Sequence, residues 1–232
     1  MGREIDSFND LLKFYRILGF TELPSSFIES FLNEADNLNS MKESKKEDKL
    51  KKINEKIKIC KKCSLSKGRT QAVCGEGNIE AKLMFIGEAP GFEEDRQGSP
   101  FVGEAGKLLT NLIEKMGFKR QDVYITNTVK CHPPENRDPF EEEVSLCFDY
   151  LQNEIDIVSP KVIMTLGKVA TYVLMGMKGK IKDLAISKIR GNVFYYKNIP
   201  VVPTFHPAYL LRNRKDKWLT WEDAQEALRR LQ

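Results

Sequence analysis

The sequence predicts an α/β protein in which amphipathic helices alternate with the strands of a parallel sheet. Four short apolar runs, rich in β-branched residues, follow one another along the chain, and helical segments separate them. Such short runs are typical of strands that are buried on both faces of a parallel sheet. Their alternation with helices is typical of an α/β sandwich with right-handed crossovers. The runs span residues 82–86, 123–126, 162–166 and 200–205.

The segments between these runs have the apolar spacing of helices. The first stripe lies within residues 108–116, and Gly117 follows at a position where helices commonly end. Asp138 and Pro139, followed by three glutamates, are typical of an N-cap, a first-turn proline and an acidic first turn. The last predicted elements are helices around residues 169–174 and 221–231, and a hairpin that pairs residues 192–196 with the final strand.

The N-terminal part of the chain differs in composition from the rest. Its first apolar residues predict a helix that ends at Gly19 and a second helix that opens at residues 24–26. Residues 41–58 are nearly all charged or polar, which predicts a solvated linker helix or, as the alternative, a basic arm beside DNA. We therefore divide the chain into a helical extension with its linker, residues 1–50, and a main domain, residues 51–232. The extension shows no recognisable chemistry, and binding a protein partner is one role open to it.

Length and composition exclude several classes of protein. The 232 residues include 37 Lys and Arg, 33 Asp and Glu, and 41% hydrophobic residues, so the chain is not disordered throughout. No apolar stretch approaches the roughly 18 residues of a membrane span, and the N-terminus lacks the apolar core of a secretory signal. A net charge of +4 does not by itself require nucleic acid. We expect a soluble, cytoplasmic monomer that does not bind membranes.

The five cysteines are an odd number, which argues against a disulfide framework. Cys60 and Cys63 form a C-x-x-C pair, and Cys131 and Cys147 follow far apart in the sequence. Four thiolates are the number that a [4Fe-4S] cluster or a structural zinc ion needs. Unligated thiols are the third possibility, and the residues alone leave all three open. Cys74 has no nearby partner, and we expect it to be a small buried hydrophobe.

Unusual residues fall at the carboxyl ends of the predicted strands, which is where open parallel sheets bind ligands. Gly87 begins the turn GEAPG, whose glycines and proline expose main-chain N–H groups. The turn matches neither the dinucleotide fingerprint nor the phosphate-binding loop, which argues against a Rossmann-type nucleotide binder. Its acidic residues can polarise water or form a solvated acidic loop. They are Glu88, Glu93, Glu94 and Asp95.

Three further side chains at these ends have the chemistry to bind a nucleobase. Phe101 is either a core residue or a stacking platform for a planar base. The Asn127 amide offers both donors and an acceptor, although a lone Asn is usually a turn former. His206 is either structural or functional. It is followed by residues 208–214, where apolar and cationic side chains alternate as in a loop that enters a DNA groove.

Four segments together resemble the family 4 uracil-DNA glycosylases, which contain an iron–sulfur cluster. They are GEAPG with ED two residues later, GSPFVGEAG, VYITNTVKCHPP and PTFHPAYLLRN. The resemblance covers roughly residues 57–232. It implies a three-layer α/β/α sandwich around a four-stranded parallel sheet. It also implies a mainly structural [4Fe-4S] cluster ligated by Cys60, Cys63, Cys131 and Cys147.

The resemblance implies roles for the residues at the strand ends. The main chain of residues 87–89 would line a uracil pocket, Phe101 would stack on the base, Asn127 would read its O4 and N3 edge, and His206 would face O2. An aspartate positions the attacking water in other members of the wider superfamily. Ala89 occupies that place here. Glu88 is therefore our first candidate for positioning water, with Glu94 and Asp95 behind it.

The implied reaction is hydrolysis of the bond between uracil N1 and deoxyribose C1′, which leaves an abasic site in DNA. Because a stacked base is unreachable, the nucleotide must be extruded from the duplex. We expect Arg212 and Arg214 to contact phosphates, and Leu210 or Leu211 to fill the vacated stack. Two alternatives remain: a glycosylase for another deaminated base such as hypoxanthine, and an iron–sulfur module that binds DNA or transfers electrons without catalysis.

Overall fold

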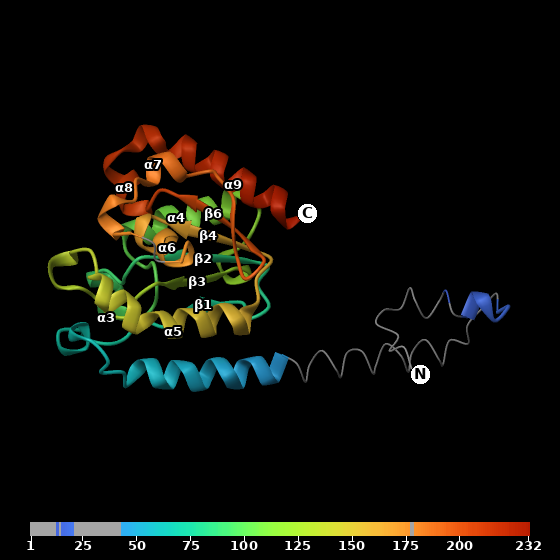
Figure 1. Cartoon of the computed structure of the whole chain (residues 1–232), viewed down its shortest axis with the longest axis horizontal. Helices are drawn as coiled ribbons and strands as arrows, with labels where there is room; N and C mark the ends of the chain where they lie inside the picture. Colours follow the sequence, from blue (N-terminus) through green and yellow to red (C-terminus); the bar gives the residue numbers. More distant parts are fainter. Residues whose placement is uncertain (1–12, 14, 21–42, 177–178) are drawn as a thin grey trace. The chain divides into compact units, whose positions relative to one another are not determined.

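The computed structural model (Figure 1) describes residues 13, 15–20, 43–176 and 179–232. The chain divides into two compact units, Met1–Lys45 and Lys46–Gln232. In the first unit, residues 15–17 are helical, and Gly19 follows with a φ of 86°. The predicted helix end at Gly19 is therefore confirmed. The second predicted helix, opening at residues 24–26, lies outside the described residues.

Residues 43–58 form one helix, so the predicted boundary after residue 50 falls inside a continuous element. The helix is less solvated than its composition predicts. Ile57 is completely buried, and Leu50 packs against the core of the second unit. The lysines at its other positions are mostly exposed, as in a helix that buries one narrow stripe.

The second unit is built on a six-stranded sheet with the order β1-β3-β2-β4-β6-β5, and the run from β1 through β3, β2 and β4 to β6 can be followed in Figure 1. The strands are β1 (Glu76–Gly77), β2 (Leu83–Gly87), β3 (Tyr124–Asn127), β4 (Val162–Leu166), β5 (Phe194–Tyr196) and β6 (Ile199–Thr204). The four central strands pair in parallel, whereas β1 and β5 pair antiparallel at the two edges. The predicted hairpin between β5 and β6 is confirmed, and Lys197 and Asn198 form its turn with positive φ.

The α/β fold is confirmed, and the sheet is larger than the predicted four strands. Strand β1 has only two residues, both exposed, so it leaves no hydrophobic pattern in the sequence. The helices are α3 (Phe92–Gln97), α4 (Glu104–Lys115), α5 (Glu141–Val158), α6 (Lys168–Leu174), α7 (Ile186–Ile189), α8 (Pro207–Arg212) and α9 (Lys217–Leu231). Among the described residues, no helix combines the length and the hydropathy that crossing a membrane requires.

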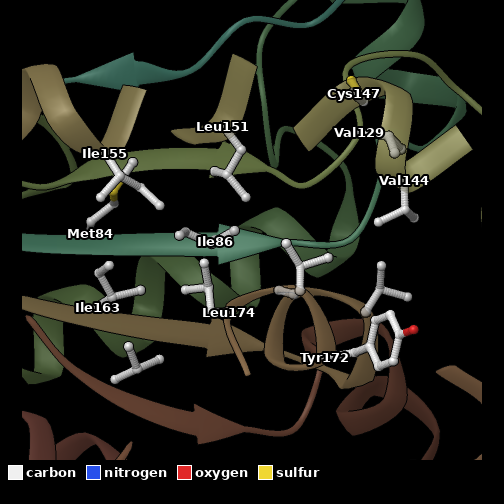
Figure 2. Packing of buried hydrophobic residues seen from close by; sticks show 14 of the residues in the cluster. Met84, Ile86, Val129, Val144, Cys147, Leu151, Ile155, Ile163, Tyr172 and Leu174 are labelled. Carbon is white, nitrogen blue, oxygen red and sulfur yellow. The ribbon is translucent and has the colours of Figure 1, made fainter. Parts of the chain in front are cut away.

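Two hydrophobic clusters cover the sheet because successive strand residues point to opposite faces. Met84 and Ile86 of β2 pack with Leu151 and Ile155 of α5 and with residues of α6 (Figure 2). The neighbouring strand residues, such as Phe85, belong to the second cluster, which contains residues of α4 and α9. Burial of both faces explains why the strand sequences are apolar without alternation.

The ends of α4 and α5 test the predicted helix caps. Gly117 follows α4 with a φ of 88°, as expected for the residue after a helix. The prediction for α5 is wrong by two residues: its N-cap is Phe140, not Asp138. Glu143 reaches back to accept a 2.8 Å hydrogen bond from the main-chain N–H of Phe140, so the cap does not need an aspartate. The predicted acidic first turn is present.

Strand register brings the four parallel carboxyl ends to the same edge of the sheet. Gly87, the last residue of β2, is paired with Asn127, the last residue of β3. Leu166 at the end of β4 is likewise paired with Thr204 at the end of β6. The segments that follow these residues therefore meet at one edge.

Candidate active site and cysteine pocket

A cavity of about 620 Å³ lies at this edge of the sheet. Its wall comes from the segments that follow β2, β3, β4 and β6, together with residues near α3 and α5. Six of the predicted site residues line it: Glu88, Ala89, Phe101, Asn127, His206 and Arg212. The structure thus brings together side chains that are more than one hundred residues apart in the sequence.

Gly87 lies behind the cavity wall and leaves no room for a side chain. A Cβ at this position would lie 2.4 Å from Cζ of Phe101 and 2.4 Å from Oδ1 of Asn127. The main-chain oxygen of Gly87 accepts hydrogen bonds from N–H and Oγ1 of Thr128, at 2.9 and 2.8 Å. The absence of a side chain therefore lets the aromatic ring and the amide approach each other at a fixed strand end.

Phe101 has a backbone conformation that is uncommon for residues other than glycine. Its φ is 53°, in the left-handed region, and its side chain is buried. Gly106 of α4 makes this possible, because a Cβ there would lie 1.9 Å from the Phe101 oxygen. The ring of Phe101 lies 5.9 Å from the ring of His206, centroid to centroid. A flat group can therefore meet an aromatic face on one side of the cavity.

Asn127 is almost completely buried, and its side-chain oxygen has no hydrogen-bond partner. Its main-chain oxygen accepts a 2.9 Å hydrogen bond from Nζ of Lys130. A buried acceptor without a partner costs about 1–3 kcal/mol, and such groups are few in folded proteins. Asn127 lines the cavity, and its side-chain oxygen is an acceptor that no group of the protein uses.

His206 is the N-cap of α8, where its Nδ1 accepts a 3.2 Å hydrogen bond from the main-chain N–H of Ala208. Burial lowers the pKa of His206 to about 4, although the carboxylates of Glu94 and Asp138 act in the opposite direction. The imidazole is therefore neutral at pH 7. Since Nδ1 is the acceptor, we assign the proton to Nε2, which leaves Nε2–H as a donor.

Two of the four acidic candidates have structural contacts that occupy their carboxylates. Glu94 accepts from the main-chain N–H groups of Val102 and Gly103, both at 2.9 Å, and from Gly91 at 3.1 Å. Asp95 is buried and accepts from the N–H of Thr70 at 2.8 Å. These carboxylates brace the turns around the cavity.

A third candidate, Glu93, forms a surface ion pair with Arg96 at 2.9 Å. Glu88 is therefore the predicted carboxylate that lines the cavity without such a brace.

Three charged residues of the cavity, Arg137, Asp138 and Lys168, were absent from the predicted site. Asp138 and Lys168 both line it, and they form a 2.5 Å ion pair between Oδ2 and Nζ. Asp138 was predicted as a helix cap, and Lys168 sits in an unremarkable position at the start of α6. Lys168 follows β4 closely, but Asp138 lies far beyond β3, so the sequence carried no signal for their pairing, which depends on how two distant turns meet.

The segment predicted to bind DNA places its residues differently. Leu210 is 4% exposed and packs in the core, and its contact with the DNA stack stays a prediction. Leu211 is 40% exposed and keeps that role as a prediction. Arg212 lines the cavity, and Arg214 begins a short 3-10 turn beyond α8.

The four cysteines of the predicted metal centre line a second, smaller pocket together with Arg69 and Lys130. Nη1 of Arg69 donates to Sγ of Cys131 at 2.9 Å, and the main-chain N–H of Lys62 donates to Sγ of Cys60 at 3.5 Å. Such donors suit sulfurs that carry negative charge. Among the residues that the structure describes, no set of three or more His, Cys, Asp or Glu side chains is arranged around a single metal ion.

Cys74 lies outside this pocket and is half-buried, not fully buried as predicted. Its thiol donates a long hydrogen bond to the main-chain oxygen of Asn54 at 3.8 Å. Burial raises the pKa of the Cys74 thiol, with smaller opposing effects from nearby lysines. The residue is an uncharged packing group at neutral pH.

The fold and the cavity define an α/β protein whose ligand site, at the carboxyl ends of parallel strands, offers a ring, an amide and a neutral imidazole. Comparison with known proteins identifies the family to which this α/β protein belongs. The sequence model of the uracil DNA glycosylase superfamily matches residues 74–232, and the chain belongs to this superfamily.

Several curated relatives are similar over most of this chain. A type-4 uracil-DNA glycosylase of Sulfurisphaera tokodaii is 48% identical over 181 residues, which cover 76% of this chain and 82% of the relative. One of Thermotoga maritima is 44% identical over 185 residues, covering 78% and 94%. One of Saccharolobus solfataricus is 49% identical over 182 residues, covering 76% and 83%.

Proposed function

We propose that this protein is a DNA repair glycosylase that hydrolyses the N-glycosidic bond of uracil in DNA and leaves an abasic site. The observation that carries the proposal is the free, buried Oδ1 of Asn127 in a cavity that also presents Phe101 and His206. The names of the relatives support it. We assign the activity to the unit Lys46–Gln232, and we propose that the protein acts as a monomer.

Base recognition rests on Asn127 and Phe101. The free Oδ1 accepts from uracil N3–H, and the amide NH2 donates to uracil O4. Cytosine presents a lone pair at N3 and an amino donor at the neighbouring position, so each contact becomes a repulsion. This rejection of cytosine is effective because the buried amide of Asn127 would be left without hydrogen-bond partners. The Phe101 ring supplies a face for stacking.

Stabilisation of the leaving group rests on His206. Negative charge builds up on the uracil oxygens as the bond between N1 and C1′ breaks. Nε2–H of the neutral imidazole donates to O2, and the donation strengthens as that charge grows. The N-cap contact with Ala208 holds the ring and its tautomer before the substrate arrives. Removing one such donor typically lowers the rate by about 10²–10³-fold.

The water that attacks C1′ needs a group that orients it, and we assign this role to Glu88. It follows β2 directly and lines the cavity. Glu94 and Asp95 were the other candidates. Their hydrogen bonds to main-chain N–H groups make them braces instead. In its ionised form, which burial shifts to higher pH, Glu88 also balances the positive charge that develops on the sugar.

The nucleotide must leave the duplex before it can enter the cavity, at a cost of a few kcal/mol. Arg212 and Arg214 contact phosphates and offset part of this cost. Leu211, the exposed member of the leucine pair, fills the space that the base leaves. These contacts place the DNA along α8 and the turn that follows it.

We further propose that Cys60, Cys63, Cys131 and Cys147 hold a [4Fe-4S] cluster. Two features support it: all four sulfurs line one pocket, and N–H donors face the sulfurs of Cys60 and Cys131. When bound, the cluster cross-links loops that are distant in the sequence. The cysteines thereby fix the loop between β3 and α5, which carries part of the cavity wall.

The test is release of free uracil from a duplex oligonucleotide with one U·G pair, followed by alkaline cleavage of the abasic strand. We expect uracil and a cleaved strand from the full-length protein, and none from an otherwise identical duplex that contains hypoxanthine. Release of hypoxanthine in preference to uracil would assign the site to another deaminated base. DNA binding without release of either base would show a non-catalytic module.

A further inference from the structure

Three charged side chains from separate turns, Glu88, Asp138 and Lys168, line the same cavity. Nζ of Lys168, at the start of α6, lies 2.5 Å from Oδ2 of Asp138, which precedes α5. The carboxyl group of Asp138 is also within hydrogen-bonding reach of the carboxyl group of Glu88, which follows β2. Two carboxyl groups in such contact cannot both be ionised without strong repulsion.

The other charged groups that line this cavity do not neutralise the pair. The Glu94 carboxylate is occupied by three main-chain N–H groups, and Arg137 is paired with Glu143 at 2.8 Å. His206 is uncharged at neutral pH. Arg212 is the remaining cation of the wall, and it does not contribute to the titration of Glu88.

We propose that Asp138 is a positioning residue for Glu88: the two carboxyl groups share one proton, and Lys168 holds Asp138 in place beside Glu88. The inference rests on the proposed function of the cavity, and it adds two residues to the site. The pair decides when Glu88 carries the charge that orients water.

The electrostatics of the two carboxyl groups show where the proton resides. Burial is the largest effect on Glu88, and the charge and hydrogen bond of Asp138 add to it, so that its pKa rises to about 8. Lys168 opposes this rise. Burial also acts to raise the pKa of Asp138, but the hydrogen bond and charge of Lys168 outweigh it and lower that pKa. At neutral pH the shared proton is therefore on Glu88.

Removing Asp138 and removing Lys168 have opposite consequences. In Asp138→Asn, Glu88 loses a negative neighbour and gains a free lysine, so it ionises at lower pH. In Lys168→Met, the pair loses its cation, so it ionises at higher pH. A purely structural role of the ion pair would give two shifts of the same sign or none. Both side chains are partly exposed, at 56% and 33%, so neither substitution leaves a buried charge behind.

The experiment is a pH titration by ¹³C NMR of the full-length protein with carboxyl-labelled glutamate, purified without oxygen. We expect one glutamate with an apparent pKa near 8 that is absent in Glu88→Gln. Its midpoint is lower in Asp138→Asn, by on the order of one pH unit, and higher in Lys168→Met. An unchanged midpoint in Asp138→Asn, or a shift of the same sign in both variants, overturns the proposal.

Uracil release by the same variants, measured as kcat against pH, distinguishes a failure of the proposed carboxyl pair from a failure of the proposed function. We expect the acidic limb of the profile to move with the NMR midpoint: down in Asp138→Asn and up in Lys168→Met. A protein that releases no uracil at any pH but shows the opposite NMR shifts overturns the proposed function and supports the pair. If the parent, Asp138→Asn and Lys168→Met all release uracil normally and their acidic limbs coincide, the proposed function is supported and the proposed role of the carboxyl pair is overturned.

Discussion

Nζ of Lys130 donates a 2.9 Å hydrogen bond to the main-chain oxygen of Asn127, the residue whose side-chain amide lines the cavity. The same ammonium group donates to Glu154 at 2.5 Å and to Thr126 at 2.6 Å, and both charged side chains are buried. Lys130 also lines the cysteine pocket. A buried ion pair thus links the cysteine pocket with the floor of the cavity.

This relationship predicts the stability of two variants. Lys130→Met leaves the Glu154 carboxylate buried without its cation, and we expect the free energy of unfolding to fall by about 3–5 kcal/mol. Adding Glu154→Met should recover much of the loss, because no buried charge then remains. Urea unfolding of the three proteins measures both effects. A double variant that is no more stable than Lys130→Met would contradict this account.

The second prediction concerns base discrimination. In Asn127→Asp the NH2 donor is lost, and a carboxylate oxygen faces uracil O4. We expect release of uracil to fall by at least about 10²-fold and the preference over cytosine to disappear. Single-turnover release from matched duplexes with U·G and C·G pairs measures both quantities. Asn111→Asp, an exposed change on α4, is the control. Equal uracil release by Asn127→Asp and the parent would refute the role of the amide.

The third prediction concerns the metal centre. Protein purified without oxygen should contain iron and absorb visible light, and Cys131→Ala should lose that absorbance because one of four ligands is missing. Cys74→Ala is the matched control, since Cys74 lies outside the pocket and should leave the absorbance unchanged. Metal analysis of the three proteins completes the test. Stoichiometric zinc without iron in the parent would reject the cluster.

The fourth prediction concerns DNA affinity. If Arg212 contacts one phosphate, Arg212→Ala should reduce the slope of log affinity against log salt by about one. Arg229 near the end of α9 is exposed and paired with Glu226, so Arg229→Ala is a control of equal charge change. Fluorescence anisotropy with a uracil-free duplex at several salt concentrations gives the slopes. The same slope for Arg212→Ala and the parent would remove Arg212 from the DNA surface.

Most of the fold and the location of the site follow from local sequence patterns. The parallel strands are visible as apolar runs, and strand polarity then requires the residues after Gly87 and Asn127 to meet. The resemblance supplied the remaining candidate residues. The strand predictions are confirmed where the signal lies in a short window of sequence, and the roles of the candidate site residues stay predictions.

The features that sequence reasoning missed all depend on contacts between distant segments. The sequence does not distinguish a buried lysine such as Lys130 from a solvated one. Its burial is explained only by its ion pair with Glu154, 24 residues later. Asp138 has the pattern of a helix cap, but its partner is Lys168. Leu210 and Leu211 are adjacent and alike in sequence, and only the packing of α8 decides which of them is exposed.

The last prediction concerns stability at acidic pH, and it follows from His206. The pKa of its imidazole is about 4 in the folded chain, below its ordinary value of 6.5, because burial disfavours the cation. As the pH falls below 6.5, the unfolded chain takes up a proton that the folded chain does not bind, and the folded state loses stability until about pH 4. The loss attributable to His206 should be on the order of 2 kcal/mol between pH 7.5 and 4.5.

His206→Asn isolates this contribution, because asparagine is a good N-cap and has no proton to bind in this range. Urea unfolding of the parent and the variant at pH 7.5 and 4.5 gives four free energies of unfolding. Other groups titrate equally in both proteins, so the parent should lose more stability than the variant between the two pH values. Parallel losses would mean that the imidazole is protonated in the folded chain, and the neutral Nε2–H donor would then no longer describe the site.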